Sequence, residues 1–169
     1  MAILAGQIRS LVHRQEINKM REIKNIIIHC TAGNQNQTVA DLKDWWKNGM
    51  GWKNVGYHKV INKLGIVTTL EPDSKITNGV AGYNSNSVHV SYMGGIDSNG
   101  KTIDNRTPEQ KVSLEAVVKA WKKLYPNAKI KGHRDFSPDK NKDGIIQPNE
   151  WMKTCPAFEV SEWLKQIGL

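Results

Sequence analysis

The sequence predicts a single α/β domain with a mixed central β-sheet flanked by helices. Short β-branched runs, typical of buried strands, alternate along the chain with longer helical patterns. Such alternation favours helices packed on a sheet. The 169 residues are enough to bury one core, and they contain no internal repeat, low-complexity tract or second domain. We therefore expect one domain over 23–169, preceded at 1–22 by an extension or a first helix.

The strands are expected where β-branched residues gather. They are placed at 23–30 ("IKNIIIHC"), on both sides of a turn at 62–65, at 86–96 and at 128–136, where the last strand reaches His133. A first helix over 39–49 is capped by Thr38 and ended by Gly49.

The clearest helix begins after Thr107, its expected cap, with Pro108 in the first turn. Its buried face is expected to carry Leu114, Val117, Trp121 and Leu124. A closing helix is expected over 156–169, with Pro156 near its start and Gly168 near its end.

Composition limits the classes of partner. The formal net charge of +8 suits an anionic partner, such as nucleic acid, a membrane surface or an acidic polymer. The basic residues are scattered and form no nucleic-acid motif, so we expect no specific nucleic acid. No apolar run is long enough to span a membrane, and Arg9 follows the weakly apolar start, so we expect neither a membrane span nor a signal peptide.

Two of the five histidines lie where chemistry is expected. His29 and His133 each end a predicted strand, and ligands collect at such strand ends in open α/β sheets. Cys155 is expected just before the closing helix, whose N-terminus would favour a thiolate. Two histidines and a cysteine form a set that zinc prefers, with a fourth position left for water. The spacing alone leaves open whether these residues share a metal site or have separate structural roles.

The other histidines and Cys30 are assigned no chemistry. His58 and His89 are placed within strands, where hydrogen-bonded structural roles are expected, and His13 lies in the extension. Cys30 faces away from His29 and is expected to be a buried free thiol, with no disulfide to Cys155.

Six blocks of sequence, in a fixed order, support a more specific reading. They are "IIIHCTAG", "GWKNVGYHKVI", "VAGYNSNSVHVSYMGGIDSNGK", "TPEQ", "GHRDFSP" and "KTCPAF". Together they resemble the zinc N-acetylmuramoyl-L-alanine amidases related to the amidase-type lysozymes of T-odd coliphages, and peptidoglycan recognition proteins share that fold. The resemblance implies hydrolysis of the amide between N-acetylmuramic acid and the L-alanine of the stem peptide, with peptidoglycan as the partner.

The resemblance also implies roles for particular residues. His29, His133 and Cys155 match the zinc ligands, Tyr57 the active-site tyrosine, and Lys153 the lysine that stabilises the oxyanion. It suggests a monomeric, bacteriolytic endolysin or a wall-remodelling enzyme, made in the cytoplasm and acting on the wall in the periplasm or outside the cell. The alternative is a peptidoglycan-binding protein of the same fold without catalysis.

The chain departs from the family pattern at two places. Many relatives carry a histidine shortly before "GYN", where this chain has Gly79 and Val80, so a contact to substrate is lost or supplied differently. The second departure is an insertion at 137–151, which separates His133 from Lys153 and Cys155.

The insertion contains the ligand order of a twelve-residue calcium loop. The ligands would be Asp139, Asn141, Asp143, the carbonyl of Ile145, Gln147 through water, and Glu150, with Gly144 at the sharp turn. Lys140 and Lys142 would weaken binding, and the helices of a paired calcium sensor are missing. Two interpretations stay open: a single calcium-ordered loop, and a turn rich in Asp and Asn without an ion.

Overall fold

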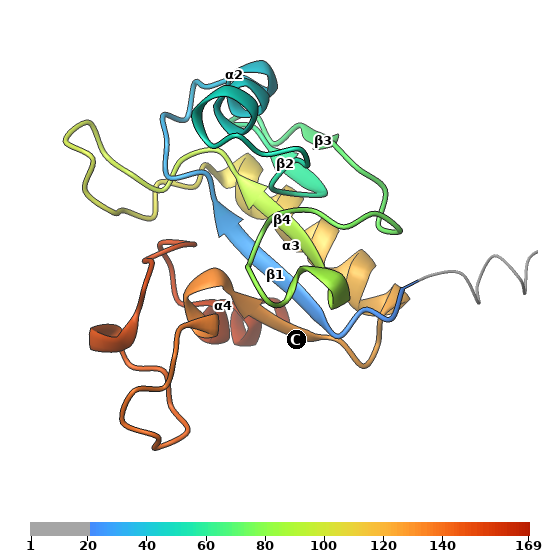
Figure 1. Cartoon of the computed structure of the whole chain (residues 1–169), viewed down its shortest axis with the longest axis vertical. Helices are drawn as coiled ribbons and strands as arrows, with labels where there is room; N and C mark the ends of the chain where they lie inside the picture. The colour runs from blue at the N-terminus through green and yellow to red at the C-terminus, as the bar shows by residue number, and fades with distance from the viewer. Residues whose placement is uncertain (1–20) are drawn as a thin grey trace, which may run out of the picture.

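The structure, a computed structural model, describes residues 21–169 and shows the α/β domain that the sequence predicts (Figure 1). A five-stranded sheet has the strand order β3-β2-β4-β1-β5. Its members are β1 (Asn25–Cys30), β2 (Lys59–Ile61), β3 (Val67–Thr69), β4 (Ser87–Tyr92) and β5 (Lys129–Gly132). The β1 strand pairs in parallel with β4 and β5, and β4 pairs in parallel with β2. Only β2 and β3 are antiparallel, so the sheet is mixed.

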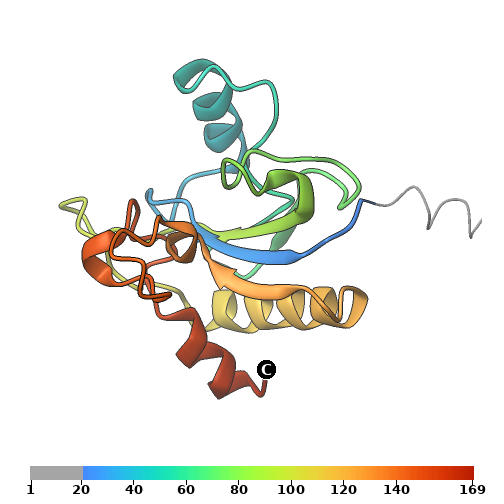
Figure 2. The ribbon, with the colours of Figure 1, turned by 60° about the horizontal axis from the view of Figure 1, so that its bottom comes forward.

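Helices cover both faces of the sheet. Figure 2 shows α2 (Val39–Asp44) on one side and α3 (Pro108–Leu124) and α4 (Val160–Ile167) on the other. The α2 helix continues as a π-helical turn, Trp45–Gly49, so the predicted first helix is present with a changed second half. Short 3₁₀ turns cover Asn84–Asn86, His133–Phe136 and Pro148–Glu150. Among the described helices, none has the length and apolar character needed to cross a membrane.

Both predicted N-caps are confirmed. Thr38 and Thr107 each accept a hydrogen bond from the backbone N–H three residues on, and the side chains of Asp41 and Gln110 bond back to the two caps. Thr107 also donates to the carbonyl of Lys63, 2.8 Å away, which fixes the start of α3 beside the β2–β3 turn.

The main core lies between the sheet and the helices α3 and α4. The buried stripe of α3 is Gln110, Leu114, Val118 and Trp121. The prediction for this face was therefore partly wrong, because Leu124 is 57% exposed and Val117 is only partly buried. Gln110 is tolerated inside because its amide donates to the carbonyls of Ile61 and Met93.

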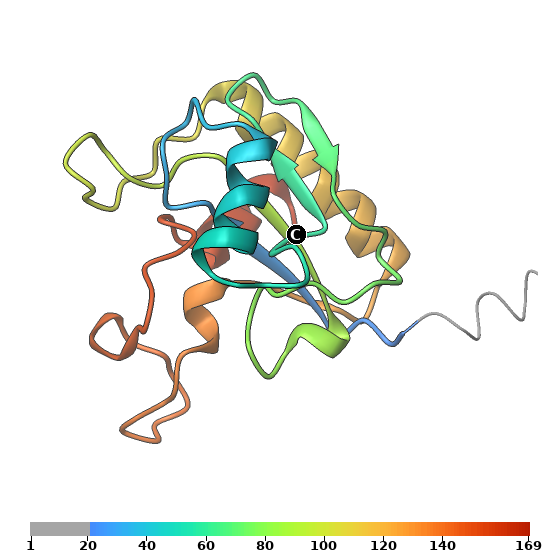
Figure 3. The same cartoon turned by 45° about the horizontal axis from the view of Figure 1, so that its top comes forward.

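A smaller core lies on the opposite face, under α2 and its π-helical turn. It consists of Leu42, Trp46, Val60 and Met93. Figure 3 shows this helical segment standing over the edge of the sheet that carries β2.

Three further predictions need correction. The closing helix begins at Val160, capped by Glu159, because Pro156 lies in a turn four residues before it. The strand expected to reach His133 ends at Gly132, and His133 begins a 3₁₀ turn. His58 immediately precedes β2 and is not within it. His13 and almost all of the expected 1–22 extension lie outside the described residues.

Candidate functional site

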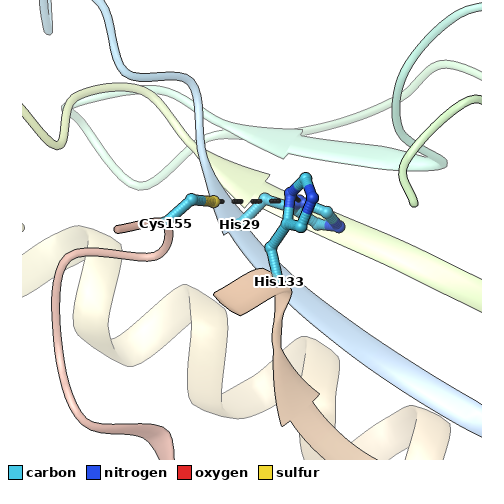
Figure 4. Close-up of side chains that lie close together, drawn as sticks. All are labelled: His29, His133 and Cys155. Atoms are coloured by element: carbon cyan, nitrogen blue, oxygen red, sulfur yellow. Dashed lines mark hydrogen bonds between the residues drawn. The ribbon is translucent and has the colours of Figure 1, made fainter. Parts of the chain in front are cut away.

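Three side chains converge at the carboxyl-terminal edge of the sheet: His29, His133 and Cys155 (Figure 4). Nδ1 of His29 lies 3.1 Å from Nδ1 of His133 and 3.8 Å from Sγ of Cys155. All three potential ligand atoms lie within 4.8 Å of one another. A tetrahedral zinc site has edges of about 3.3 Å between two nitrogens and about 3.6 Å between nitrogen and sulfur. The donor types and the two distances from Nδ1 of His29 therefore fit zinc.

The sheet brings the two histidines together. In the parallel pairing of β1 with β5, Ile28 lies opposite Gly132. His29 is the next residue of β1, and His133 directly follows the last residue of β5, so the two meet although 104 positions separate them. This edge is where ligands bind in parallel α/β sheets.

Cys155 is positioned by three hydrogen bonds from distant parts of the chain. The backbone N–H of Cys30 donates to Sγ of Cys155 over 3.1 Å. The N–H of Arg134 donates to the carbonyl of Cys155 over 2.9 Å. The hydroxyl of Tyr92 donates to the carbonyl of Pro156 over 2.6 Å. Cys30 is a buried free thiol, as predicted, and Cys155 is also buried and forms no disulfide with it.

Burial sets the charge state of the three side chains. Burial lowers the pKa of His29 well below its ordinary value, and it lowers the pKa of His133 to about 4. The positive charge of Lys153 lowers both pKa values further. Both rings are therefore neutral at pH 7, as metal ligation requires.

The same burial raises the pKa of the Cys155 thiol. The expectation that a helix N-terminus favours its thiolate is thus wrong, because α4 begins five residues further on. A metal binding here would displace the thiol proton.

Tyr57 packs against His29, and Lys153 lines the same cavity as His133. The ring centroid of Tyr57 is 4.9 Å from that of His29, and its hydroxyl donates to the carbonyl of Cys30 over 3.5 Å. Burial raises the pKa of Tyr57, so its hydroxyl stays protonated at neutral pH. Lys153 is exposed and, with His133, lines a cavity of about 410 Å³. Its other walls include Trp52, Gly79, Phe136 and Met152.

The insertion forms a loop that projects from the domain (Figure 1) and is closed at its base. The N–H of Met152 donates to Oγ of Ser137 over 3.0 Å, and the guanidinium of Arg134 lies 4.0 Å from the Trp151 ring centroid. Because His133 and Cys155 flank this segment, the loop lies on the path between two of the three side chains.

Inside the loop, backbone N–H groups are taken up by side-chain oxygens. Oδ2 of Asp139 accepts from Gly144, Oδ1 of Asn141 from Asp143, and Oδ1 of Asp143 from Ile145. Glu150, only 2% exposed, accepts from the N–H groups of Lys140, Asn141 and Gln147. Oδ1 of Asp139 is buried and has no hydrogen-bond partner among the described residues.

The sequence did not reveal that His89 contacts His29. It is fully buried in β4, and its Nδ1 lies 3.1 Å from Nε2 of His29. His89 is hydrogen-bonded, as expected, but its partner is His29, which is itself a candidate metal ligand. The alternating apolar residues along β4 indicated that His89 is buried. Its contact with His29 depends on the pairing of β4 with β1, which no local sequence pattern reveals.

A family model described as N-acetylmuramoyl-L-alanine amidase matches residues 19–157. The endolysin of Enterobacteria phage K11 is 33% identical over 152 residues, covering 89% of this chain and 91% of that protein. The endolysin of Escherichia phage T7 is 32% identical over 154 residues, covering 89% and 92%.

Solved structures share the fold. The N-acetylmuramoyl-L-alanine amidase LysC from Clostridium intestinale superposes with a TM-score of 0.67 at 22% identity, covering 89% of this chain and 88% of that one. The bumblebee peptidoglycan recognition protein PGRP-SA gives a TM-score of 0.61 at 16% identity, covering 85% and 80%. These likenesses agree with the predicted mixed-sheet architecture.

Proposed function

Because this chain belongs to the N-acetylmuramoyl-L-alanine amidase family, we propose that it hydrolyses the amide bond between N-acetylmuramic acid and L-alanine in peptidoglycan. The observation that carries the proposal is the convergence of His29, His133 and Cys155 in zinc-like geometry beside an open cavity. Zinc held by these residues would supply a hydroxide nucleophile at neutral pH and polarise the scissile carbonyl.

Two side chains of the chain would complete the site. Lys153, on the wall of the cavity beside His133, is a cation that can stabilise the oxyanion developing as the amide is attacked. Tyr57 keeps its proton, because burial raises its pKa, so we assign it the role of a hydrogen-bond donor to substrate and not of a base.

The curated relatives favour a lytic role. Two phage endolysins match over about nine-tenths of both chains. We therefore propose a bacteriolytic lysin, made in the cytoplasm and acting as a monomer on the cell wall. The +8 charge suits wall polymers that carry carboxylates.

The alternative is a protein that binds peptidoglycan without cleaving it. The shared fold of PGRP-SA is compatible with that role. The presence of Cys155 together with Tyr57 and Lys153 favours catalysis, because a binding protein has no need of a third zinc ligand or an oxyanion partner.

Digestion of purified peptidoglycan, followed by mass spectrometry of the soluble products, tests the proposal. We expect free stem peptides that begin with L-alanine, and we expect their release to stop with a zinc chelator and in Cys155→Ser. Cleavage within the sugar chain would refute the proposed bond. Binding to the wall with no release of peptide would support the recognition alternative.

We further propose that the loop at 139–150 binds calcium. Its sequence supplies ligands in the order that a calcium loop uses, and the unpartnered Oδ1 of Asp139 is a buried oxygen that a cation would satisfy. The acidic side chains of the loop are not gathered as tightly as the zinc set. That is expected, because calcium takes 6–8 oxygens at about 2.3–2.6 Å, so opposite ligands lie about 5 Å apart.

Thermal unfolding of the zinc-loaded protein tests calcium binding. At a calcium concentration of about 100 Kd the stabilisation is about 2.7 kcal/mol, which raises Tm by roughly 5–10 °C in a domain of this size. Magnesium at the same concentration should do much less. Asp139→Ala should abolish the response. Asp97→Ala is the matched control, because Asp97 also accepts backbone N–H groups in an exposed turn. An unchanged melting curve of the wild type would disprove calcium binding.

A further inference from the structure

The two ring nitrogens of His29 have different partners. Its Nδ1 faces His133 and Cys155, whereas its Nε2 lies 3.1 Å from Nδ1 of His89 in a fully buried contact. A ligand nitrogen must offer its lone pair to the metal, so in His29 the proton must be on Nε2. That N–H needs an acceptor, and His89 provides it.

We propose that His89 is a positioning residue, whose Nδ1 accepts the Nε2–H of His29 and thereby presents Nδ1 of His29 to the metal. This inference rests on the zinc site of the proposed function and adds a residue to it. Partners of this kind fix the tautomer and the ring orientation of ligating histidines.

The environment of Nε2 of His89 indicates that the ring does more than occupy space in the core. When Nδ1 of His89 accepts from His29, its own proton is on Nε2, and that atom is buried without a hydrogen-bond partner among the described residues. An apolar side chain of similar size would avoid this unsatisfied donor. The bond to His29 gives a reason for an imidazole here.

The surroundings hold the His89 ring in this orientation. The backbone N–H of His89 donates to Nδ1 of His58 over 3.0 Å, and the two rings stack with centroids 5.7 Å apart. On another side lies Gly79. A Cβ at position 79 would stand 2.2 Å from Nδ1 of His89 and 2.5 Å from Cγ and Cε1.

A side chain at position 79 and the imidazole of His89 therefore exclude each other. This explains why the chain has glycine at this departure from the family pattern: the space beside His29 is filled by an imidazole from β4.

Zinc affinity, measured by competition with a chromogenic chelator, tests the role of His89 without relying on activity. His89→Leu removes the acceptor, and we expect zinc to bind 10- to 100-fold more weakly. His89→Asn keeps a short side chain with an acceptor oxygen and should recover most of the affinity. Val88→Ala is the control, because Val88 is equally buried in β4 but belongs to the core cluster with α3 and α4. It should bind zinc as the wild type does.

A double-mutant cycle tests the same contact with His89 retained. Gly79→Ala should weaken zinc binding in the wild type by displacing the His89 ring. It should add nothing in His89→Ala, where the ring is already gone. Unaltered zinc affinity in both His89→Leu and Gly79→Ala would overturn the inference and leave the proposed function intact. A wild-type protein that binds no zinc would overturn the proposed function itself.

Discussion

Removing the hydroxyl of Tyr92 should weaken both the fold and the zinc site. Tyr92 is fully buried at the end of β4, and its hydroxyl donates to the carbonyl of Pro156, the residue bonded to Cys155. Tyr92→Phe keeps the ring and its contact with Phe158. It leaves the carbonyl of Pro156 without its donor.

The size of the effect follows from this geometry. A buried acceptor left without its partner destabilises by about 1–3 kcal/mol. For a domain of this length, 1 kcal/mol corresponds to about 2–4 °C in Tm, so Tm should fall by roughly 2–12 °C. If the segment that carries Cys155 also loosens, each tenfold loss of zinc affinity removes about 1.4 kcal/mol of the stabilisation that zinc provides.

Thermal unfolding with and without saturating zinc separates the two effects. The drop in Tm should be larger with zinc than without it, because the metal-free protein loses only the hydrogen bond. Tyr83→Phe is the control, since Tyr83 is 42% exposed and its hydroxyl can be hydrated in either state. A drop in Tm that is equal with and without zinc would refute the positioning role of this bond.

Two other perturbations have defined outcomes. Lys153→Met should lower kcat by about 10²–10³, the usual effect of removing an oxyanion partner, with bound zinc per chain unchanged by elemental analysis; wild-type turnover would contradict its proposed role. Acid should destabilise the fold through His58, because burial lowers its pKa to about 4, below the ordinary value of about 6.5. Between these two pH values, His58 binds a proton in the unfolded chain but not in the folded chain. The contribution of His58 to the free energy of unfolding is therefore complete above about pH 6.5, and it falls by about 3 kcal/mol as the pH drops to 4. Urea unfolding at pH 7, 5 and 4 should show a shallower loss in His58→Asn than in the wild type, and an identical loss would exclude this cause.

Local signals were sufficient for much of the fold. The threonine caps at Thr38 and Thr107 act within three residues of themselves, and both helices begin where these residues predict. The β-branched run at 23–30 marks a strand that is buried on both faces, which a continuous apolar run is well suited to indicate.

Predictions failed where long-range packing decides the outcome. On α3, Val118 is buried and Leu124 is exposed. Which side of α3 is buried depends on how the helix packs against the sheet. The sequence of the helix alone does not specify that packing. Cys155 is likewise placed by Tyr92 and Arg134 and not by a helix terminus. These partners lie far from Cys155 in sequence and share no recognisable spacing with it.

The three proposed zinc ligands are therefore held in two different ways. His29 and His133 are fixed by the register of β1 against β5, because a shift of one residue would turn every side chain of β5 to the opposite face of the sheet. Cys155 arrives at the end of a 21-residue connection that includes the 15-residue insertion at 137–151. Without the insertion the connection would have 6 residues. Closing a flexible connection of 21 residues costs about 1 kcal/mol more than closing one of 6, which corresponds to a roughly sixfold loss in zinc affinity. The hydrogen bond from the N–H of Met152 to Oγ of Ser137 closes the base of the loop and offsets this penalty when the loop is ordered. Calcium in the loop can therefore strengthen zinc binding only by about that factor through loop closure, and a much larger coupling would require calcium to move Cys155 or Lys153 themselves.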